Sequence, residues 1–294
     1  MTQMKFGVFK YYRTPNLGDE IQSVAAARLL PRVDHYIERE EMHLFRADES
    51  VFLVANGWYI HNSEAFPPAA SIRPFYISVH FTSENLFSPA AIAHLKEHEP
   101  IGCRDPFTLR AMRRHGIAAY LSGCLTMTLE PRDVEKQTDA VYIVDVNESL
   151  LPRIPEDLRR SAVRLTHFPK ERPREQKFAQ AERLLGLYAT ARLVITGRLH
   201  CALPCLALRT PVVLLHPDRY DPRFGAIEPF LSVHNAESNN IDWEPEPPDV
   251  AEHAQRLRKL CRLAIEAQAN PLRHNPHARF LSTQLQEPWV KAES

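Results

Sequence analysis

Residues 193–204 read Leu-Val-Ile-Thr-Gly-Arg-Leu-His-Cys-Ala-Leu-Pro, and this stretch decides the fold class. The apolar run at 193–196 predicts a buried strand, and residues 201–208 predict a helix that is apolar on all sides. A buried strand that leads directly into a buried helix is the building unit of parallel sheets. We therefore expect an α/β protein.

The same alternation of short apolar runs and amphipathic stretches continues in both directions along the chain. The best supported helix covers residues 176–192, where six apolar residues fall on one face of a 3.6-residue period. Further helices are expected at 19–30, 89–97, 106–115 and 250–265. Strands are expected at 5–12, 33–37, 50–59, 74–81, 100–103, 118–121, 140–146 and 211–216.

The length of the chain predicts two domains, because 294 residues correspond to two units of about 150 residues each. The charged segment 130–138 lacks an apolar pattern and is typical of a linker. We expect an N-terminal α/β domain at 1–130 and a C-terminal α/β domain with a final helix at 139–270. Residues 271–294 are expected to form a loosely packed tail.

Composition excludes several classes of protein. Lys plus Arg and Asp plus Glu both number 36, so the balanced charge argues against nucleic-acid binding. No apolar run approaches the ~20 residues that cross a bilayer, and the N-terminus lacks the apolar segment of a signal peptide. The odd number of cysteines, 5, is typical of reduced, buried thiols. We therefore expect a cytoplasmic protein.

Ligands of open α/β sheets bind beyond the carboxyl ends of the strands, so the strand-to-helix junctions are the candidate sites. The first junction is Asn16-Leu17-Gly18-Asp19-Glu20, which follows the first expected strand. Gly18 permits a tight turn and close approach of a ligand, and Asn16 and Asp19 offer polar groups at a helix start. The same residues also fit a simple helix cap, and both interpretations stay open.

The second junction contains Arg104, Asp105, Pro106 and Thr108. Asp105 followed by Pro106 predicts a helix cap and a first helical residue without any further function. Arg104 suits a carboxylate or phosphate, because the planar guanidinium binds such oxygens in pairs, although most arginines are surface residues.

The third junction is the stretch quoted first, where Arg198 and His200 lie between two apolar elements. Burial of a charge is costly without a partner, so an anionic ligand is a sensible partner for Arg198. His200 is the side chain best suited to exchange protons near neutral pH, and its alternative role is a buried histidine bonded to the backbone.

Other motifs are weaker. His94 and His98 lie four residues apart on an expected helix, but no HExxH motif accompanies them, and we expect a solvated helix face and no metal. Glycine spacings typical of dinucleotide-binding loops and P-loops are absent, as is the GxSxG motif of hydrolases.

At these junctions the chain resembles the polysaccharide pyruvyl transferase family. The resemblance spans about residues 5 to 217 and is most specific at the block Val194-Ile195-Thr196-Gly197-Arg198-Leu199-His200. The other matching pieces are Asn16-Leu17-Gly18-Asp19, then Gly102-Cys103-Arg104-Asp105 with Thr108 and His115-Gly116-Ile117, and finally Arg209-Thr210-Pro211-Val212-Val213.

The resemblance implies two Rossmann-like domains that face each other across a cleft, an arrangement called GT-B-like. It also implies transfer of the enolpyruvyl group of phosphoenolpyruvate to a sugar, with closure of a pyruvate ketal and release of phosphate. The acceptor would belong to an exopolysaccharide or another cell-envelope glycan. No cofactor or metal is implied, and membrane contact would be peripheral at most, through a lipid-linked acceptor.

The resemblance assigns roles to residues of this chain. His200 is the expected proton donor, and Asp105 or Asp19 would assist the sugar hydroxyl. Arg198 and Arg104 would bind the two anionic groups of phosphoenolpyruvate. Further substrate contacts are expected from Leu199, Asn16, Gly18, Thr108 and His216, where His216 either contacts phosphate or merely ends a strand.

Two rival functions stay open at this point. A glycosyltransferase of the same architecture would bind a sugar nucleotide rather than phosphoenolpyruvate. A non-catalytic binding protein would keep the fold without the chemistry, although the retention of both Arg198 and His200 argues against it. The sequence does not identify the acceptor sugar or the oligomeric state.

Overall fold

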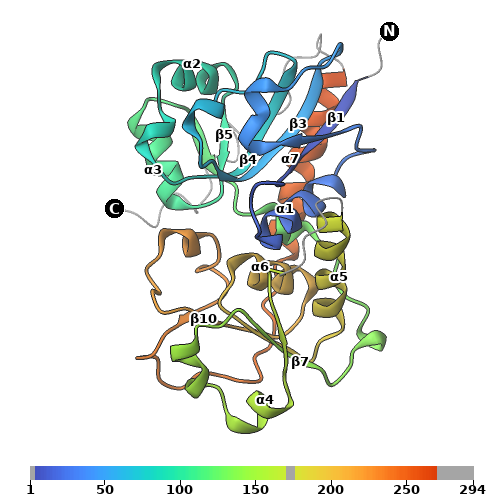
Figure 1. The fold of residues 1–294 in the computed structure, drawn as a ribbon, viewed down its shortest axis with the longest axis vertical. Helices are drawn as coiled ribbons and strands as arrows, with labels where there is room; N and C mark the ends of the chain where they lie inside the picture. The colour runs from blue at the N-terminus through green and yellow to red at the C-terminus, as the bar shows by residue number, and fades with distance from the viewer. Residues whose placement is uncertain (1–3, 170–175, 270–294) are drawn as a thin grey trace. The chain divides into compact units, whose positions relative to one another are not determined.

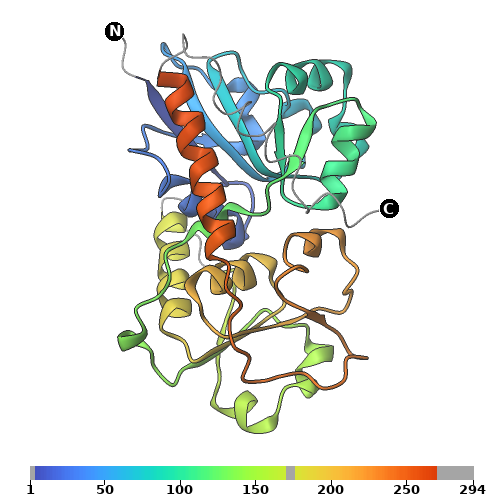
Figure 2. The same ribbon diagram turned by 180° about the vertical axis from the view of Figure 1, so that it is seen from behind.

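The computed structural model describes residues 4–169 and 176–269, so the expected tail at 271–294 lies outside the described residues. The chain divides into two compact units, each drawn as a ribbon in Figures 1 and 2. Within the described residues, unit 1 contains 4–11, 26–123 and 255–269, and unit 2 contains 12–25, 124–169 and 176–254. Each unit thus combines separate segments of the chain, whereas the expected domains were contiguous.

Unit 1 is built on a parallel sheet of six strands in the order β2-β1-β3-β4-β5-β6. Strand β3 is central and almost entirely buried, because its apolar residues pack on both faces of the sheet. Val54 of β3 pairs with Val8 on one side and with Phe75 on the other. The strands are β1 Lys5–Lys10, β2 His35–Glu38, β3 Val51–Tyr59, β4 Ile72–Phe81, β5 Ile101–Cys103 and β6 Ala119–Leu121.

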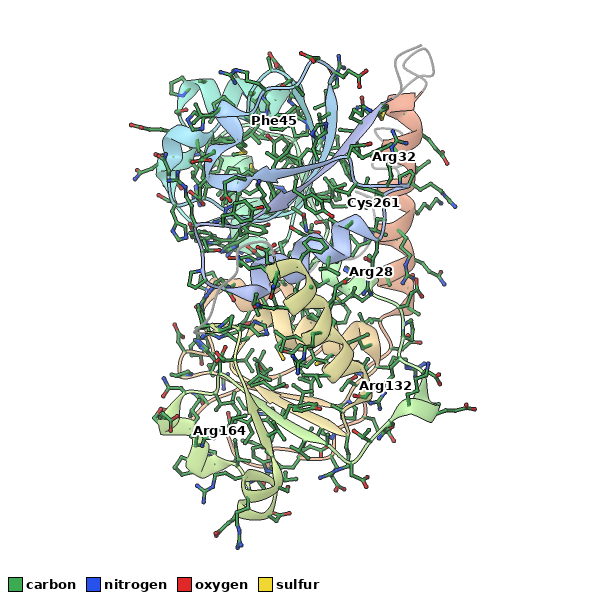
Figure 3. The ribbon with its side chains drawn as sticks, turned by 45° about the vertical axis from the view of Figure 1, so that its right-hand side comes forward. Arg28, Arg32, Phe45, Arg132, Arg164 and Cys261 are labelled. Atoms are coloured by element: carbon green, nitrogen blue, oxygen red, sulfur yellow. The ribbon has the colours of Figure 1, made fainter. Side chains whose placement is uncertain are left out.

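The helices of unit 1 are α2 Pro89–Glu97, α3 Pro106–Arg114 and the part of α7 that begins at Gln255. Helix α7, Ala251–Ala269, runs along one face of the sheet and lies in front of it in Figure 2. It buries a stripe of apolar residues at helical spacing, of which Cys261 is labelled in Figure 3. Burial raises the pKa of Cys261 to about 12. The final helix expected from the sequence therefore exists, and most of it belongs to unit 1.

Unit 2 contains a parallel sheet of five strands in the order β11-β10-β9-β7-β8. The strands are β7 Val141–Val144, β8 Val163–Leu165, β9 Leu193–Thr196, β10 Val212–Leu215 and β11 Val233–His234. Its helices are α4 Glu156–Ser161, α5 Lys177–Thr190, α6 Leu199–Leu208 and the larger part of α1 Leu17–Ala27. Helix α5 buries the apolar face that the sequence predicted, and α6 is almost wholly buried.

The sequence analysis missed three short elements of unit 2, namely β8, β11 and α4. Val163 of β8 is 53% exposed, so this edge strand lacks the apolar run that marks a buried strand. The expected linker at 130–138 contains a short 3₁₀ helix and is bonded to unit 2. Arg132, labelled in Figure 3, donates from Nη1 to the carbonyl oxygen of Ala191 at 2.5 Å.

Short 3₁₀ helices occupy several loops. They are η1 Arg39–Leu44, η2 Ser63–Ala65, η3 Glu84–Leu86, η4 Leu125–Thr128, η5 Val134–Lys136, η6 Glu148–Arg153 and η8 Pro222–Ala226. Among the described helices, none is long and apolar enough to cross a membrane.

The two sheets share one topology. Numbered by chain order within each unit, the strands run 2-1-3-4-5 across both sheets, and unit 1 adds a sixth strand. In this doubly wound arrangement the strand order reverses between the first and third strands, and ligands bind at the carboxyl ends of those two strands. The reversal falls between β1 and β3 in unit 1 and between β7 and β9 in unit 2. The α/β class with two parallel sheets is thereby confirmed.

Candidate functional site

An ion pair stands at the reversal point of unit 2. Asp145 follows β7 directly, and Arg198 lies two residues beyond β9. Nε of Arg198 is 3.0 Å from Oδ2 of Asp145, and the two side chains are 36% and 13% exposed, respectively. The guanidinium also lies over the ring of Phe168, at 4.5 Å from its centroid. A cation is therefore fixed at the carboxyl ends of the two strands where this fold places ligands.

Gly197 is required by the close approach of two strand ends. A Cβ atom at this position would lie 2.6 Å from the carbonyl oxygen of Asp145 and 3.3 Å from that of Leu215. Both neighbours are backbone atoms, so neither moves easily. Gly197 therefore lets the turn after β9 pass between the ends of β7 and β10.

Helix α6 begins directly after Arg198, two residues earlier than the sequence predicted. The hydroxyl of Thr196 accepts a hydrogen bond from the backbone N–H of Arg198 at 3.0 Å and fixes the turn. Leu199 and His200 then form the first turn, where Leu199 is 9% exposed and His200 is half-buried. The positive end of the helix dipole and the guanidinium of Arg198 thus lie at the same junction, which favours an anionic ligand.

The start of α1 is capped by the protein itself. The N–H of Leu17 donates to the carbonyl of His167 at 2.9 Å, and that of Gly18 donates to Oδ1 of Asn16 at 3.0 Å. Asp19 is 8% exposed and accepts hydrogen bonds from Thr14 and Gln22. These contacts match the helix-cap interpretation of Asn16 and Asp19.

Gly18 brings α1 against the α6 junction. A Cβ atom here would lie 3.1 Å from Nδ1 of His167 and 3.2 Å from Cβ of His200. The absent side chain therefore makes room for two histidines of unit 2. Through this contact the structure brings the Asn16, Gly18 and Asp19 group to Arg198, Leu199 and His200.

This cluster also contains Asp145, His167 and Cys201, which were not among the predicted site residues. The N–H of His167 donates to Oδ2 of Asp145 at 3.0 Å, and its Nε2 lies 2.9 Å from the hydroxyl of Tyr188. Cys201 is fully buried, and although burial opposes the shift, hydrogen bonds from Cys205 and His167 lower the pKa of the Cys201 thiol. All five cysteines are free and buried, as predicted.

Asp145 carried a signal that was available in the sequence. The expected strand at 140–146 continued through this residue, but β7 ends at Val144 and Asp145 has a φ of 47°. Aspartate tolerates this left-handed conformation better than most residues. A polar residue inside an apolar strand pattern marks the end of the strand, where ligand-facing groups occur.

A buried ion pair ties α1 to α5. Nζ of Lys177 lies 2.7 Å from Oε1 of Glu20, and it donates to the carbonyl oxygen of Thr14 at 3.0 Å. The two side chains are 4% and 3% exposed. This pair holds the start of α1 in place within unit 2.

The second junction forms a separate group in unit 1. Asp105 caps α3, because its Oδ1 accepts a hydrogen bond from the N–H of Thr108 at 2.9 Å. Its Oδ2 lies 2.5 Å from Nδ1 of His80 and 3.6 Å from Nε of Arg104. All four side chains are at most 2% exposed. Burial would raise the pKa of Asp105, but the hydrogen bond and charge of His80 and the charge of Arg104 hold this pKa below its ordinary value.

The reversal point of unit 1 is filled by residues of the chain itself. NH groups of Arg39 pair with Glu40 at 2.6 Å, and the side chains are 0% and 6% exposed. Glu40 also accepts the backbone N–H groups of His61 and Asn62, just after β3. Unit 2 is therefore the better candidate for ligand binding, because the cation at its reversal point, Arg198, is partly exposed, whereas Arg39 in unit 1 is buried.

His216 follows β10, the strand next to β9. Its Nδ1 lies 2.7 Å from the carbonyl oxygen of Asp218, and its ring packs against Phe224 at a centroid distance of 4.8 Å. His216 therefore lies at the same edge of the sheet as Arg198, with one ring nitrogen held by the following loop.

The fold and these contacts define an α/β protein that has a doubly wound sheet in each unit and an arginine at the reversal point of the second. The model of the polysaccharide pyruvyl transferase family matches residues 16–219, and the chain belongs to this family. The resemblance predicted from the sequence is thereby confirmed, and the matched segment contains every candidate residue named above.

The comparisons with curated proteins and with solved structures give no further family assignment. No curated protein matches the chain in a sequence comparison. Among solved structures, the UDP-GlcNAc 2-epimerase of Methanocaldococcus jannaschii, in complex with UDP-GlcNAc and UDP, aligns with a TM-score of 0.42. The identity is 11%, over 88% of this chain and 99% of that chain.

Proposed function

We propose that this protein transfers the enolpyruvyl group of phosphoenolpyruvate to a sugar and closes a pyruvate ketal across two hydroxyls. Membership of the pyruvyl transferase family supports the reaction class. The observation that carries the site is the partly exposed Arg198, held by Asp145 at the reversal point of the unit 2 sheet.

Arg198 is the proposed anchor of the donor. Phosphoenolpyruvate carries a carboxylate and a phosphate, and both match the paired N–H groups of a guanidinium. The bond to Asp145 uses Nε and sets the plane of the guanidinium, so that Nη1 and Nη2 form the fork for the ligand. The first turn of α6, including the backbone N–H of Leu199, adds the positive end of a helix dipole.

His200 is the proposed proton donor. Protonation of the methylene carbon of the donor makes the adjacent carbon electrophilic, and an imidazole in the first turn of α6 is suited to this step. Two sugar hydroxyls then form C–O bonds to that carbon, and the C–O bond to phosphate breaks. The sugar loses two hydroxyl protons. One replaces the proton that was given to the new methyl group, and the other leaves with phosphate.

The remaining candidates receive supporting roles in this proposal. Asp19, in the first turn of α1 beside Gly18 and Asn16, is the proposed base for the attacking hydroxyl. His216 is a proposed phosphate contact. Arg104, Asp105 and Thr108 are buried in unit 1, so we propose that they act on the substrate through their neighbours, as positioning residues.

The acceptor that we propose is a sugar of an exopolysaccharide or another cell-surface glycan, either free or lipid-linked. The five free cysteines support a reducing compartment, the cytoplasm, as the place of the reaction.

The test measures donor binding and turnover separately. Calorimetric titration with phosphoenolpyruvate and phosphate release with a panel of sugars are compared for the parent, Arg198→Ala, Arg198→Lys and His200→Gln. We expect both Arg198 variants to bind the donor at least about tenfold more weakly, because lysine keeps the charge but not the fork. His200→Gln should bind the donor normally and lose turnover.

Arg164→Ala is the matched control, since Arg164 is 59% exposed and pairs with an exposed Glu148. This variant should behave as the parent. Equal donor binding by the parent and Arg198→Ala would remove the site assignment. Turnover of a sugar nucleotide without binding of phosphoenolpyruvate would establish the glycosyltransferase alternative, and binding of neither would contradict both donor assignments.

A further inference from the structure

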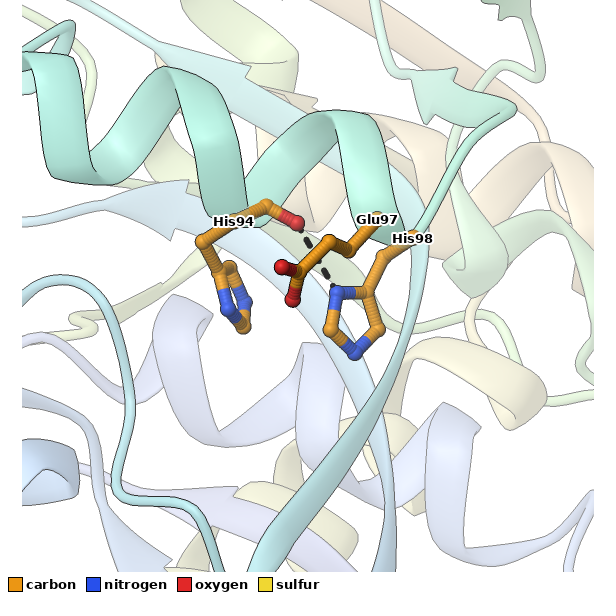
Figure 4. A group of neighbouring side chains, drawn as sticks. All are labelled: His94, Glu97 and His98. Atoms are coloured by element: carbon orange, nitrogen blue, oxygen red, sulfur yellow. Dashed lines mark hydrogen bonds between the residues drawn. The ribbon is translucent and has the colours of Figure 1, made fainter.

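Three side chains that can bind a metal lie together on α2 in unit 1. His94, Glu97 and His98 each direct one ligand atom into a group whose members lie within 4.8 Å of one another. Figure 4 shows the three side chains on the same side of the helix. The spacing explains this arrangement, because positions i, i+3 and i+4 share one face of an α-helix.

Each imidazole also makes a hydrogen bond that does not involve the ligand atoms of the group. Nδ1 of His98 donates to the carbonyl oxygen of His94 at 2.9 Å, which leaves the lone pair of the ring on Nε2 (Figure 4). Nε2 of His94 lies 2.7 Å from the hydroxyl of Tyr76 on β4. Metal-binding histidines usually make such second contacts, which select the tautomer and the direction of the ring.

The packing around α2 corrects the prediction of a solvated histidine face. His94 and His98 are both half-buried, and their ring centroids lie 4.3 Å apart. His94 packs edge-on against Phe66 and Tyr76 at 5.7 and 5.8 Å.

We propose that His94, Glu97 and His98 form a binding site for Zn²⁺. Two imidazole nitrogens and one carboxylate oxygen are a common ligand set for this ion, and a fourth position is left for water. Zinc bonds of about 2.0–2.2 Å bring tetrahedral ligands within roughly 3.5 Å of one another. A rotamer change of the exposed Glu97 side chain and small rotations of the two imidazoles can bring the ligand atoms to this distance.

Bound zinc would link three side chains across one turn of α2. Because the folded helix holds the three ligands together and the unfolded chain does not, zinc should bind the folded chain more tightly and raise the melting temperature as its concentration increases. This inference is independent of the proposed pyruvyl transfer, and its test requires no activity measurement.

The experiment uses the untagged full chain in equilibrium dialysis against zinc chloride, followed by metal analysis and thermal unfolding. We expect the parent to bind one zinc ion per chain. His98→Ala and Glu97→Gln each remove one ligand and keep His94 with its bond to Tyr76, and both should weaken binding by about tenfold or more. Tyr76→Phe should weaken binding less, because it removes only the bond that orients His94.

His61→Ala is the matched control, since His61 is an exposed histidine of the same unit. This variant should bind zinc as the parent does. Cobalt substituted for zinc should give the visible absorption bands of a tetrahedral site in the parent and not in His98→Ala. No uptake by the parent at 100 μM zinc would overturn the proposal, and so would equal uptake by the parent, His98→Ala and Glu97→Gln.

Discussion

Nε of Arg198 lies 3.0 Å from Oδ2 of Asp145, across the point where the strand order of the unit 2 sheet reverses. The two residues follow neighbouring parallel strands, β9 and β7, whose carboxyl ends meet at one edge. Asp145 thus fixes the direction of a cation that is still partly exposed. Four predictions follow from this junction and from the contacts that support each unit.

Asp145→Asn should weaken binding of phosphoenolpyruvate while leaving the fold unchanged. Asparagine also tolerates the φ of 47° and can still accept the N–H of His167, so the backbone is undisturbed. Loss of the charge leaves Arg198 free to turn, and we expect the KM for the donor to rise about tenfold with a smaller change in kcat. Glu148→Gln, at an exposed pair with Arg164, is the control and should match the parent. An unchanged KM in Asp145→Asn would contradict the orienting role.

Gly197→Ala should destabilise unit 2. The new methyl group would meet the carbonyl oxygen of Asp145 at 2.6 Å, and overpacking against backbone costs about 1–3 kcal/mol. The comparison is Gly186→Ala in the exposed part of α5, where no heavy atom lies within 4 Å of the added Cβ. That variant should gain about 0.5–1 kcal/mol, because alanine is the better helix former. Urea unfolding measures both, and a stable Gly197→Ala would show that the strand ends can separate.

Lys177→Met should cost about 3–5 kcal/mol of unfolding free energy, because it leaves the carboxylate of Glu20 buried without its ammonium partner. The double variant Lys177→Met with Glu20→Leu should recover most of the loss, since no buried charge remains. Lys136→Met is the surface control: Lys136 pairs with Asp133 at 3.2 Å, but it is 75% exposed, and its loss should be near neutral. Additive effects of the two buried substitutions would argue against a coupled pair.

Asp105 should make unit 1 sensitive to acid. Its pKa in the folded protein lies below the ordinary value of 3.8, so the ionised carboxylate stabilises the fold. This contribution is complete above the pKa of the unfolded chain and is lost as the pH falls through the lower, folded pKa. Asp105→Asn keeps the helix cap but has no charge to titrate.

The stability difference between the parent and Asp105→Asn should therefore shrink as the pH falls below about 4. Denaturant unfolding at pH 6, 4 and 3 measures this difference. Other carboxylates titrate equally in both proteins and cancel. A difference that does not change with pH would mean that the Asp105 carboxylate is not stabilised by His80 and Arg104.

Local pattern was enough to predict most elements of both sheets. Strand β9 coincides with the predicted apolar run, because burial on both faces removes polar residues from a strand, and helix α6 ends where predicted but begins two residues earlier. The cap of α3 was also predictable, since Asp105 and Pro106 satisfy and occupy the first turn without help from distant residues. The short strands β8 and β11 were missed because edge strands need no apolar face.

The candidate site was predicted only in part. Arg198 and His200 were visible as polar residues between two apolar elements, and the family motif contains both. Their pairing with Asp145 and His167 was not visible, because these residues reach the junction only through the alignment of β7, β8 and β9 in the sheet. The pairing of His80 with Asp105 likewise depends on β4 lying next to β5.

The sequence by itself determined the fold class, most of the order of strands and helices, and the family, since each depends on the spacing of neighbouring residues. Only the tertiary structure decided which charges meet. Whether Arg198 carries its charge beside Asp145, or His80 lies buried beside Asp105, depends on which strand ends become adjacent. The physical reason is that hydrophobic burial is encoded locally, by the apolar face of each element, whereas an ion pair forms between loops that are distant in the chain.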